Sequence, residues 1–136
     1  MRMLAIVAAL FLTLPARALD EGGRAAIRGV IERQLEAFRA DDATAAYSQA
    51  APAIQRLFPS EEQFMRMVRE GYRPVYRPRS YGFDEFRDTP AGPSQAVRLQ
   101  DADGVDWIAV YSLEQQPDGS WKISGCSLVK APGEAV

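Results

Sequence analysis

The chain has 136 residues, a formal net charge of −2 and 47% hydrophobic residues, which suffices for one domain with a substantial core. It contains no histidine and a single cysteine. This excludes Ser-His-Asp and Cys-His catalysis, ordinary zinc sites and Cys-x-x-Cys redox chemistry. The sequence has no Gly-rich phosphate loop, and its acidic balance argues against a nucleic-acid binder. We therefore expect no metal, no cofactor and no nucleic-acid partner.

Residues 1–18 have the pattern of a secretory signal peptide. A basic start precedes an apolar run from Leu4 to Leu14, and Ala16 and Ala18 place small residues before a cleavage site after Ala18. The run is too short to span a bilayer, which takes about 20 residues. We expect residues 19–136 to form a single exported domain, periplasmic in a Gram-negative source, with no integral membrane anchor. Loss of Arg2 and Arg17 would leave 14 basic and 18 acidic residues, net −4.

Apolar residues at steps of three and four predict helices in the first half of the chain. A helix is expected from about Arg24 to Ala40, beginning after Gly22-Gly23 because glycines make a poor helix interior. Its apolar stripe consists of Ile27, Val30, Ile31, Leu35 and Phe38. The pair Asp41-Asp42 offers a cap for a second helix, and Pro52 suits the first turn of a third, which ends near Phe58.

A capping box predicts the next helix. Ser60 is followed three residues later by Gln63, with acidic residues between them in the first turn. The apolar stripe of this helix consists of Phe64, Met67 and Val68. Gly71 is placed to end it in a left-handed conformation, and Pro74 lies just beyond.

The segment YRPVYRPRSY at residues 72–81 follows. Its prolines disfavour helix at the residues that precede them, so we expect an extended crossover from helices to sheet. In an extended chain the arginines at 73, 77 and 79 lie on one side and the tyrosines at 72 and 76 on the other. Arginines suit carboxylate or phosphate capture. The alternative is that they pair with the acidic excess while the tyrosines cover the core.

The second half is typical of an antiparallel meander. Strands are expected at 81–86, 96–100, 105–113 and 121–129, with Asp-Gly turns at 101–104 and 116–120. Helices gathered on one side of such a sheet make an α+β domain. Cys126 falls in the last strand, either as a small apolar filler or as a reactive thiol.

The strand at 105–113 is apolar on both faces, which indicates that both faces are covered. One face carries Trp107, Ala109, Tyr111 and Leu113. The other carries Ile108 and Val110. The helices would cover one face, and either a second copy of the chain or a flanking loop would cover the other.

Four stretches carry a resemblance: AFRADDATAAY, IQRLFPSEEQFMRMV, YRPVYRPRSY and DADGVDWIAVYSLEQQPDGSWKISGC. Together they resemble an uncharacterised bacterial family, domain of unknown function 4864. Helical segments followed by a curved meander also resemble the nuclear transport factor 2-like superfamily. That resemblance implies a cone-shaped α+β fold with N-terminal helices packed on a curved antiparallel sheet. The superfamily hosts isomerases, dehydratases, transport factors and inert pocket proteins, so it does not select a function.

We expect a non-catalytic domain that binds a small amphipathic or anionic ligand, or a protein partner. The candidate ligand-binding residues are Tyr47, Phe64, Met67, Tyr76, Arg77, Arg79, Trp107 and Tyr111. The alternative is an isomerase or dehydratase that uses a carboxylate and a tyrosine in the cone pocket. Its base would be Asp84, Glu85 or Asp106, and its hydroxyl donor Tyr47, Tyr76, Tyr81 or Tyr111. Nothing in the spacing assigns a catalytic residue. A third class is an accessory protein that acts through its surface.

Overall fold

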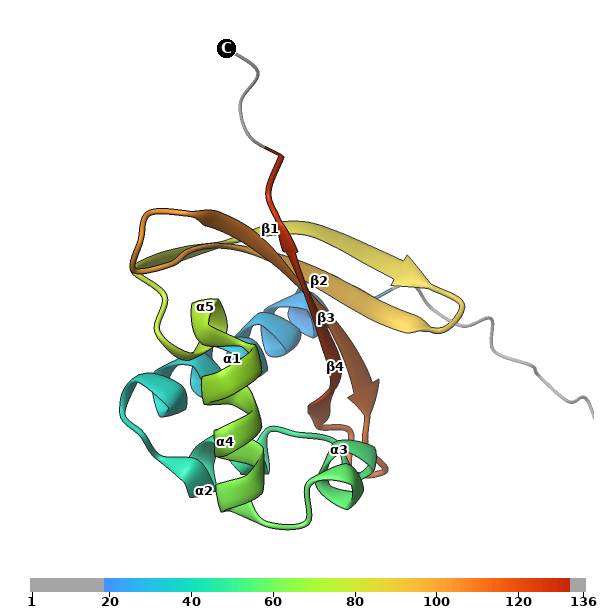
Figure 1. Cartoon of the computed structure of the whole chain (residues 1–136). Helices are drawn as coiled ribbons and strands as arrows, with labels where there is room; N and C mark the ends of the chain where they lie inside the picture. The colour runs from blue at the N-terminus through green and yellow to red at the C-terminus, as the bar shows by residue number, and fades with distance from the viewer. Residues whose placement is uncertain (1–18, 133–136) are drawn as a thin grey trace, which may run out of the picture.

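A computed structural model describes residues 19–132 and shows an α+β arrangement, with helices followed by a curved antiparallel sheet (Figure 1). The helices are α1 (Glu21–Arg39), α2 (Ala43–Ser48), α3 (Pro52–Leu57), α4 (Glu61–Gly71) and α5 (Arg73–Tyr76). The strands are β1 (Ser80–Thr89), β2 (Gly92–Gln100), β3 (Asp106–Gln115) and β4 (Trp121–Lys130). The predicted signal peptide and its cleavage site lie outside the described residues. Over residues 19–132, no helix combines the length and the apolarity needed to cross a membrane.

The first helix begins earlier than its glycine pair predicts. Helix α1 starts at Glu21 and includes both glycines, because the side chain of Asp20 accepts a hydrogen bond from the backbone N–H of Gly23 at 2.9 Å. This cap satisfies one of the free N–H groups at the helix start and offsets the poor helix propensity of glycine. The prediction that the helix starts after Gly23 is therefore wrong.

The predicted caps of the next helices are confirmed. The side chain of Asp42 accepts from the N–H of Ala45 at 3.0 Å, and that of Ser60 from Gln63 at 3.1 Å. Pro52 occupies the first turn of α3, where a missing N–H costs nothing. Each of these short helices is thus started by a local sequence signal.

The segment 72–81 is not extended throughout, and that prediction is wrong for its first half. Residues Arg73–Tyr76 form the one-turn helix α5, in which Pro74 sits in the first turn and needs no N–H partner. Gly71 is not left-handed as predicted, because the N–H of Tyr72 continues the bonding of α4 to the carbonyl of Val68 at 2.9 Å. The helical turn also removes the expected alternation of arginines and tyrosines.

The four strands are hydrogen-bonded in the order β1-β2-β3-β4, with every neighbouring pair antiparallel. Both predicted Asp-Gly turns are confirmed, with Gly104 and Gly119 at φ 79° and 87°. A third turn, at 89–92, joins β1 to β2 and has Gly92 at φ 118°. Both strands are longer than predicted, since β1 continues beyond Phe86 and β2 begins at Gly92. In β1 an irregular pairing between Phe83 and Phe86 interrupts the alternation.

The core lies between the helices and the concave face of the sheet (Figure 1). Ala109, Tyr111 and Leu113 of β3 point into it and belong to the same buried cluster as the apolar face of α1. On the opposite face, Val110 is 38% exposed and Val129 is 51% exposed. The described residues therefore leave Val110 and Val129 uncovered, although Ile108 on the same face is partly buried.

Candidate ligand-binding cavity

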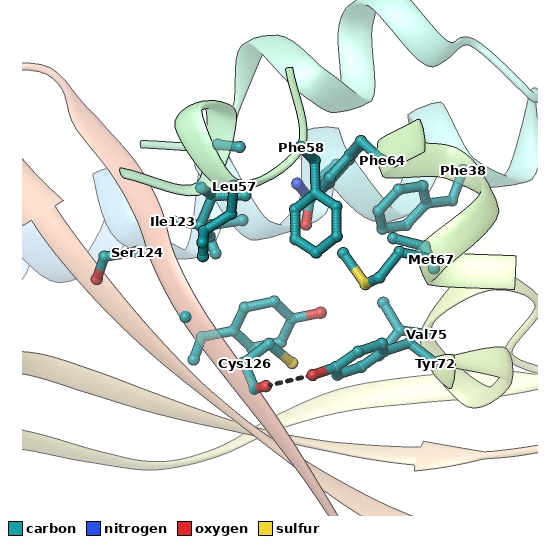
Figure 2. Close-up of a pocket in the computed structure, with 16 residues that line it drawn as sticks. Phe38, Leu57, Phe58, Phe64, Met67, Tyr72, Val75, Ile123, Ser124 and Cys126 are labelled. Carbon is teal, nitrogen blue, oxygen red and sulfur yellow. Dashed lines mark hydrogen bonds between the residues drawn. The ribbon is translucent and has the colours of Figure 1, made fainter. Parts of the chain in front are cut away.

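A cavity of about 320 Å³ lies between the helices and the inner face of β4 (Figure 2). It is lined by Gln34, Phe38, Ala50, Ile54, Leu57, Phe58, Phe64, Met67, Val68, Tyr72, Val75, Tyr111, Ile123, Ser124, Gly125 and Cys126. None of these residues carries a charge at neutral pH. The walls are mainly aliphatic and aromatic, which is typical of small-molecule pockets.

The cavity has an open and a closed end. Leu57 lines it while remaining 74% exposed, so this side chain lies where the cavity meets solvent. Tyr111, like Phe38, lines it while only 1% exposed, so both belong to its buried inner wall, which we call the closed end. Figure 2 shows Phe58, Phe64 and Met67 gathered on one side of the space, with Tyr72 and Cys126 on the other.

Helix α3 forms one wall of the cavity and is tied down by Tyr47. The hydroxyl of Tyr47 donates to the backbone carbonyl of Phe58 at 2.7 Å and lies 3.2 Å from that of Gln55. The amide of Gln55 donates back to the carbonyl of Tyr47 at 3.1 Å. The ring of Tyr47 packs edge-on against Phe64, with centroids 5.5 Å apart. Tyr47 therefore supports the cavity wall and does not line it.

Two of the polar lining side chains already have partners. The amide of Gln34 donates to the carbonyl of Ala46 at 3.1 Å, and the hydroxyl of Tyr72 donates to the carbonyl of Cys126 at 3.2 Å (Figure 2). The first bond fixes α2 against α1, and the second joins the end of α4 to β4. Both groups thus act in holding the walls together.

Among residues 19–132 the buried hydroxyl of Tyr111 has no hydrogen-bond partner, and the adjacent Cys126 thiol interacts with it only weakly. Burial raises the pKa of Tyr111 well above its ordinary value, with a smaller contribution from neighbouring Cys126. Burial also raises the pKa of the Cys126 thiol to about 12, and the adjacent Tyr111 hydroxyl opposes only part of this rise. Both groups are therefore neutral at physiological pH, and sulfur is only a weak acceptor for the tyrosine.

Of the predicted ligand-binding residues, the structure brings together Phe64, Met67 and Tyr111 in the cavity lining. Tyr76 and Arg77 lie outside it and bind Asp41 at the end of α1. The guanidinium of Arg77 contacts the Asp41 carboxylate at 2.7 Å and donates to the carbonyl of Phe38, while the Tyr76 hydroxyl donates to the other oxygen of Asp41. The Tyr76 hydrogen bond, followed by the positive charge of Arg77, lowers the pKa of Asp41.

Arg79 and Trp107 also lie away from the cavity. Arg79 is exposed, and its backbone N–H bonds to the carbonyl of Gln100 at 2.8 Å. The indole N–H of Trp107 donates to Asp101 at 2.8 Å and so braces the turn at 101–104. For Arg77, the alternative expectation is therefore met: this arginine pairs with an acidic residue.

The acids named for the enzyme alternative do not reach the cavity. Asp84 and Asp106 border a separate surface hollow of about 270 Å³, together with Tyr81. Asp84 lies 3.9 Å from Arg98 there, and both side chains are about half exposed. Glu85 is paired instead with Arg87 at 3.0 Å on the strand surface. Among the described residues, the acids named for the enzyme alternative thus share a site with a tyrosine at this surface hollow, while Tyr76 binds the carboxylate of Asp41.

Three lining residues that could matter for binding were missed from the sequence: Gln34, Tyr72 and Cys126. Gln34 could have been found, because it interrupts the apolar stripe of the first helix at a buried position. No local pattern indicates Tyr72 and Cys126, which meet across 54 residues of chain.

Within the described range, no three His, Cys, Asp or Glu side chains gather in a way that could hold a metal ion. No curated protein and no solved structure matches this sequence. A family model described as "Domain of unknown function (DUF4864)" matches residues 21–136, which is most of the chain. The protein is therefore a member of the DUF4864 family.

Proposed function

We propose that this protein is a non-catalytic module that binds a small, largely apolar molecule in the cavity between α3, α4, α5 and β4. The observation that carries the proposal is the uncharged, mainly apolar lining of a space of about 320 Å³. Ligand pockets in proteins span roughly 300–1,000 Å³. The expected ligand is thus at the small end of that range.

The lining also bears on the enzyme alternative. An isomerase or dehydratase of the predicted kind needs a carboxylate base next to its tyrosine donor. The cavity brings Tyr111 next to a thiol with a strongly raised pKa, and none of its described lining residues is an acid. Binding without chemistry is therefore the function that this geometry supports best.

We further propose that residues 19–136 form one exported domain of bacterial origin with a nuclear transport factor 2-like fold. Support comes from the signal-peptide pattern at residues 1–18 and from helices held beneath a curved antiparallel sheet (Figure 1). In a Gram-negative source, the periplasm is the expected location. Edman sequencing of the protein secreted by its host tests the leader, and a start at Leu19 is the expected result.

A filled-cavity variant tests the binding proposal. Met67→Trp places a large ring in the cavity, whereas Arg66→Trp adds the same ring on the exposed side of the same helix. Titration with the neutral fluorescent probe N-phenyl-1-naphthylamine should give saturable binding to the wild type and to Arg66→Trp, and at least about 10-fold weaker binding to Met67→Trp. Equal binding by all three proteins would refute the cavity as the site.

A second proposal concerns the outer face of the sheet, where we expect a homodimer contact. Ile108 pairs with Val129 across the ladder, and Val110 lies next to both on the same face. The adjacent Asp84 and Arg98 have opposite charges, so two copies related by a two-fold axis can place unlike charges opposite each other. Light scattering after size exclusion should give a dimer mass for the wild type and a monomer mass for Val110→Lys. A monomeric wild type at high concentration contradicts this proposal.

A further inference from the structure

We infer that the cavity takes a ligand with a neutral hydrogen-bond acceptor, such as a ketone, aldehyde, ester or amide carbonyl, which binds the hydroxyl of Tyr111 while the apolar remainder extends toward Leu57. This inference rests on the proposed binding function and adds the chemical class of the ligand and its orientation. It is carried by the unsatisfied hydroxyl at the closed end of the cavity.

A buried hydroxyl without a partner is costly, and native structures satisfy nearly all of them. The Tyr111 oxygen lies among apolar side chains, with the weakly accepting sulfur of Cys126 as its polar neighbour. A strong acceptor on a bound molecule would satisfy this hydroxyl. The chain therefore keeps a donor at the closed end of an otherwise apolar space.

Two other polar lining side chains already donate to the backbone. The Gln34 amide and the Tyr72 hydroxyl donate to backbone carbonyls. The hydroxyl of Ser124 points away from the other labelled side chains in Figure 2. Among the described lining residues, this leaves Tyr111 as the buried hydroxyl without a partner, beside the second N–H of the Gln34 amide and the weak Cys126 thiol.

The acceptor is inferred to be neutral because none of the described residues that line the cavity is cationic. A carboxylate moved from water into such surroundings loses its hydration and gains at most one neutral hydroxyl, which is a large net cost. A carbonyl oxygen loses much less and gains the same bond. The anionic ligand expected from Arg77 and Arg79 does not fit here, since neither residue lines this space.

The two ends of the cavity set the orientation. The Tyr111 oxygen is buried, so a ligand reaches it only when a neighbouring side chain moves aside. Met67 is suited to this, because it is unbranched, flexible and only half-buried in the cavity wall. At the mouth, the exposed side chain of Leu57 offers apolar contact to the outer part of the ligand.

Three probes of similar size test the inference: butyrophenone with a neutral carbonyl, n-butylbenzene with no acceptor, and 4-phenylbutyrate with a charge. Their dissociation constants are measured at pH 7 by displacement of N-phenyl-1-naphthylamine. We expect the wild type to bind butyrophenone most tightly. In Tyr111→Phe, butyrophenone should bind about 2- to 12-fold more weakly, while n-butylbenzene changes by less than about 2-fold. Tyr81→Phe, a tyrosine outside the cavity, should bind all three as the wild type does.

The outcomes separate the two proposals. If n-butylbenzene binds but butyrophenone has no advantage, or if 4-phenylbutyrate binds most tightly, the neutral-acceptor inference fails while the binding function stands. If none of the probes binds the wild type, the proposed function itself fails. The ranking within the wild type needs no variant, so the inference remains testable even if Tyr111→Phe is poorly folded.

Discussion

The hydroxyl of Tyr72 donates to the backbone carbonyl of Cys126 at 3.2 Å and so joins the end of helix α4 to strand β4. Both residues line the cavity, and the bond crosses one side of it (Figure 2). The cavity is therefore framed by a long-range contact between the helical half and the sheet half of the fold. The stability of the protein, the reactivity of Cys126 and the binding of probes can each be tested by changing single side chains.

Tyr72→Phe should destabilise the protein, because it removes the hydroxyl while leaving the ring. The expected loss is about 1 kcal/mol in the free energy of unfolding, the usual net value of one hydrogen bond. Urea unfolding followed by circular dichroism measures it. Tyr81→Phe serves as control, since the hydroxyl of Tyr81 makes no hydrogen bond to any described residue, and it should change little. Equal stability of Tyr72→Phe and wild type would show that the bond is not formed in solution.

Tyr111→Phe and Tyr47→Phe should have opposite effects on the ligand-free protein. Tyr111→Phe removes a buried hydroxyl that has no partner, so the unfolding free energy should rise by about 1 kcal/mol. Tyr47→Phe removes a hydroxyl bonded to the carbonyl of Phe58, so the unfolding free energy should fall by about 1 kcal/mol. Urea midpoints of the two variants give the signs directly. A loss of stability in Tyr111→Phe would mean that its hydroxyl is already satisfied without a ligand.

Cys126 should react slowly with thiol reagents in the folded protein. With its pKa raised to about 12, the thiolate fraction at pH 8 is on the order of 10³-fold below that of a free cysteine of pKa about 8.5. Ellman's reagent should therefore react rapidly only after the protein is unfolded in urea. Fast labelling of the native protein would contradict the raised pKa of this partly buried thiol and favour the reactive-thiol alternative.

Acid should weaken the junction between Asp41, Tyr76 and Arg77. The pKa of Asp41 is lower in the folded than in the unfolded chain, so its contribution to stability is present above the unfolded value of about 3.8 and is lost as the pH falls through the folded value. Stability measured from pH 5 downward should fall less steeply in Asp41→Asn than in the wild type. Asparagine tolerates the left-handed backbone at this position, where φ is 52°.

Asp103→Asn is the matched control for that titration. Its side chain is exposed and makes no ion pair with any residue in the described range. The variant should follow the wild-type pH curve. A parallel fall in all three proteins would show that Asp41 is not coupled to folding.

Double replacement of Arg77 and Arg79 by alanine should leave probe binding unchanged, because both side chains lie outside the cavity. Arg77→Ala alone should lower stability, since it removes the bond to the carbonyl of Phe38. Fluorescence titration with N-phenyl-1-naphthylamine gives the affinity, and thermal unfolding gives the stability. If the double variant lost affinity for the probe but kept its thermal stability, the hypothesis that Arg77 and Arg79 bind the ligand would be supported again.

Local features of the sequence predicted local features of the fold. The caps at Asp42 and Ser60 and the turns at Gly104 and Gly119 depend on a few neighbouring residues, and each is confirmed. The α+β class follows from these elements in order. The predicted start of α1 was wrong because two local effects compete there. The cap by Asp20 outweighs the poor helix propensity of the two glycines.

The site was only partly predictable, because it depends on contacts between distant segments. Phe64 and Met67 were found through the apolar stripe of α4, and Tyr111 through the alternation of β3. Tyr76 and Arg77 were predicted as ligand-binding residues because of their residue types, but the one-turn helix α5 places them next to Asp41. This contact joins segments that are far apart in the sequence, so no pattern within one segment predicts it.

Methyl NMR of the wild type titrated with butyrophenone tests the cavity most directly. The account predicts shifts at the methyl groups of Met67, Val75 and Ile123, which line the cavity, and none at Val110 and Val129 on the outer face of the sheet. Shifts confined to the outer face, or no shifts at all at saturating butyrophenone, would contradict it.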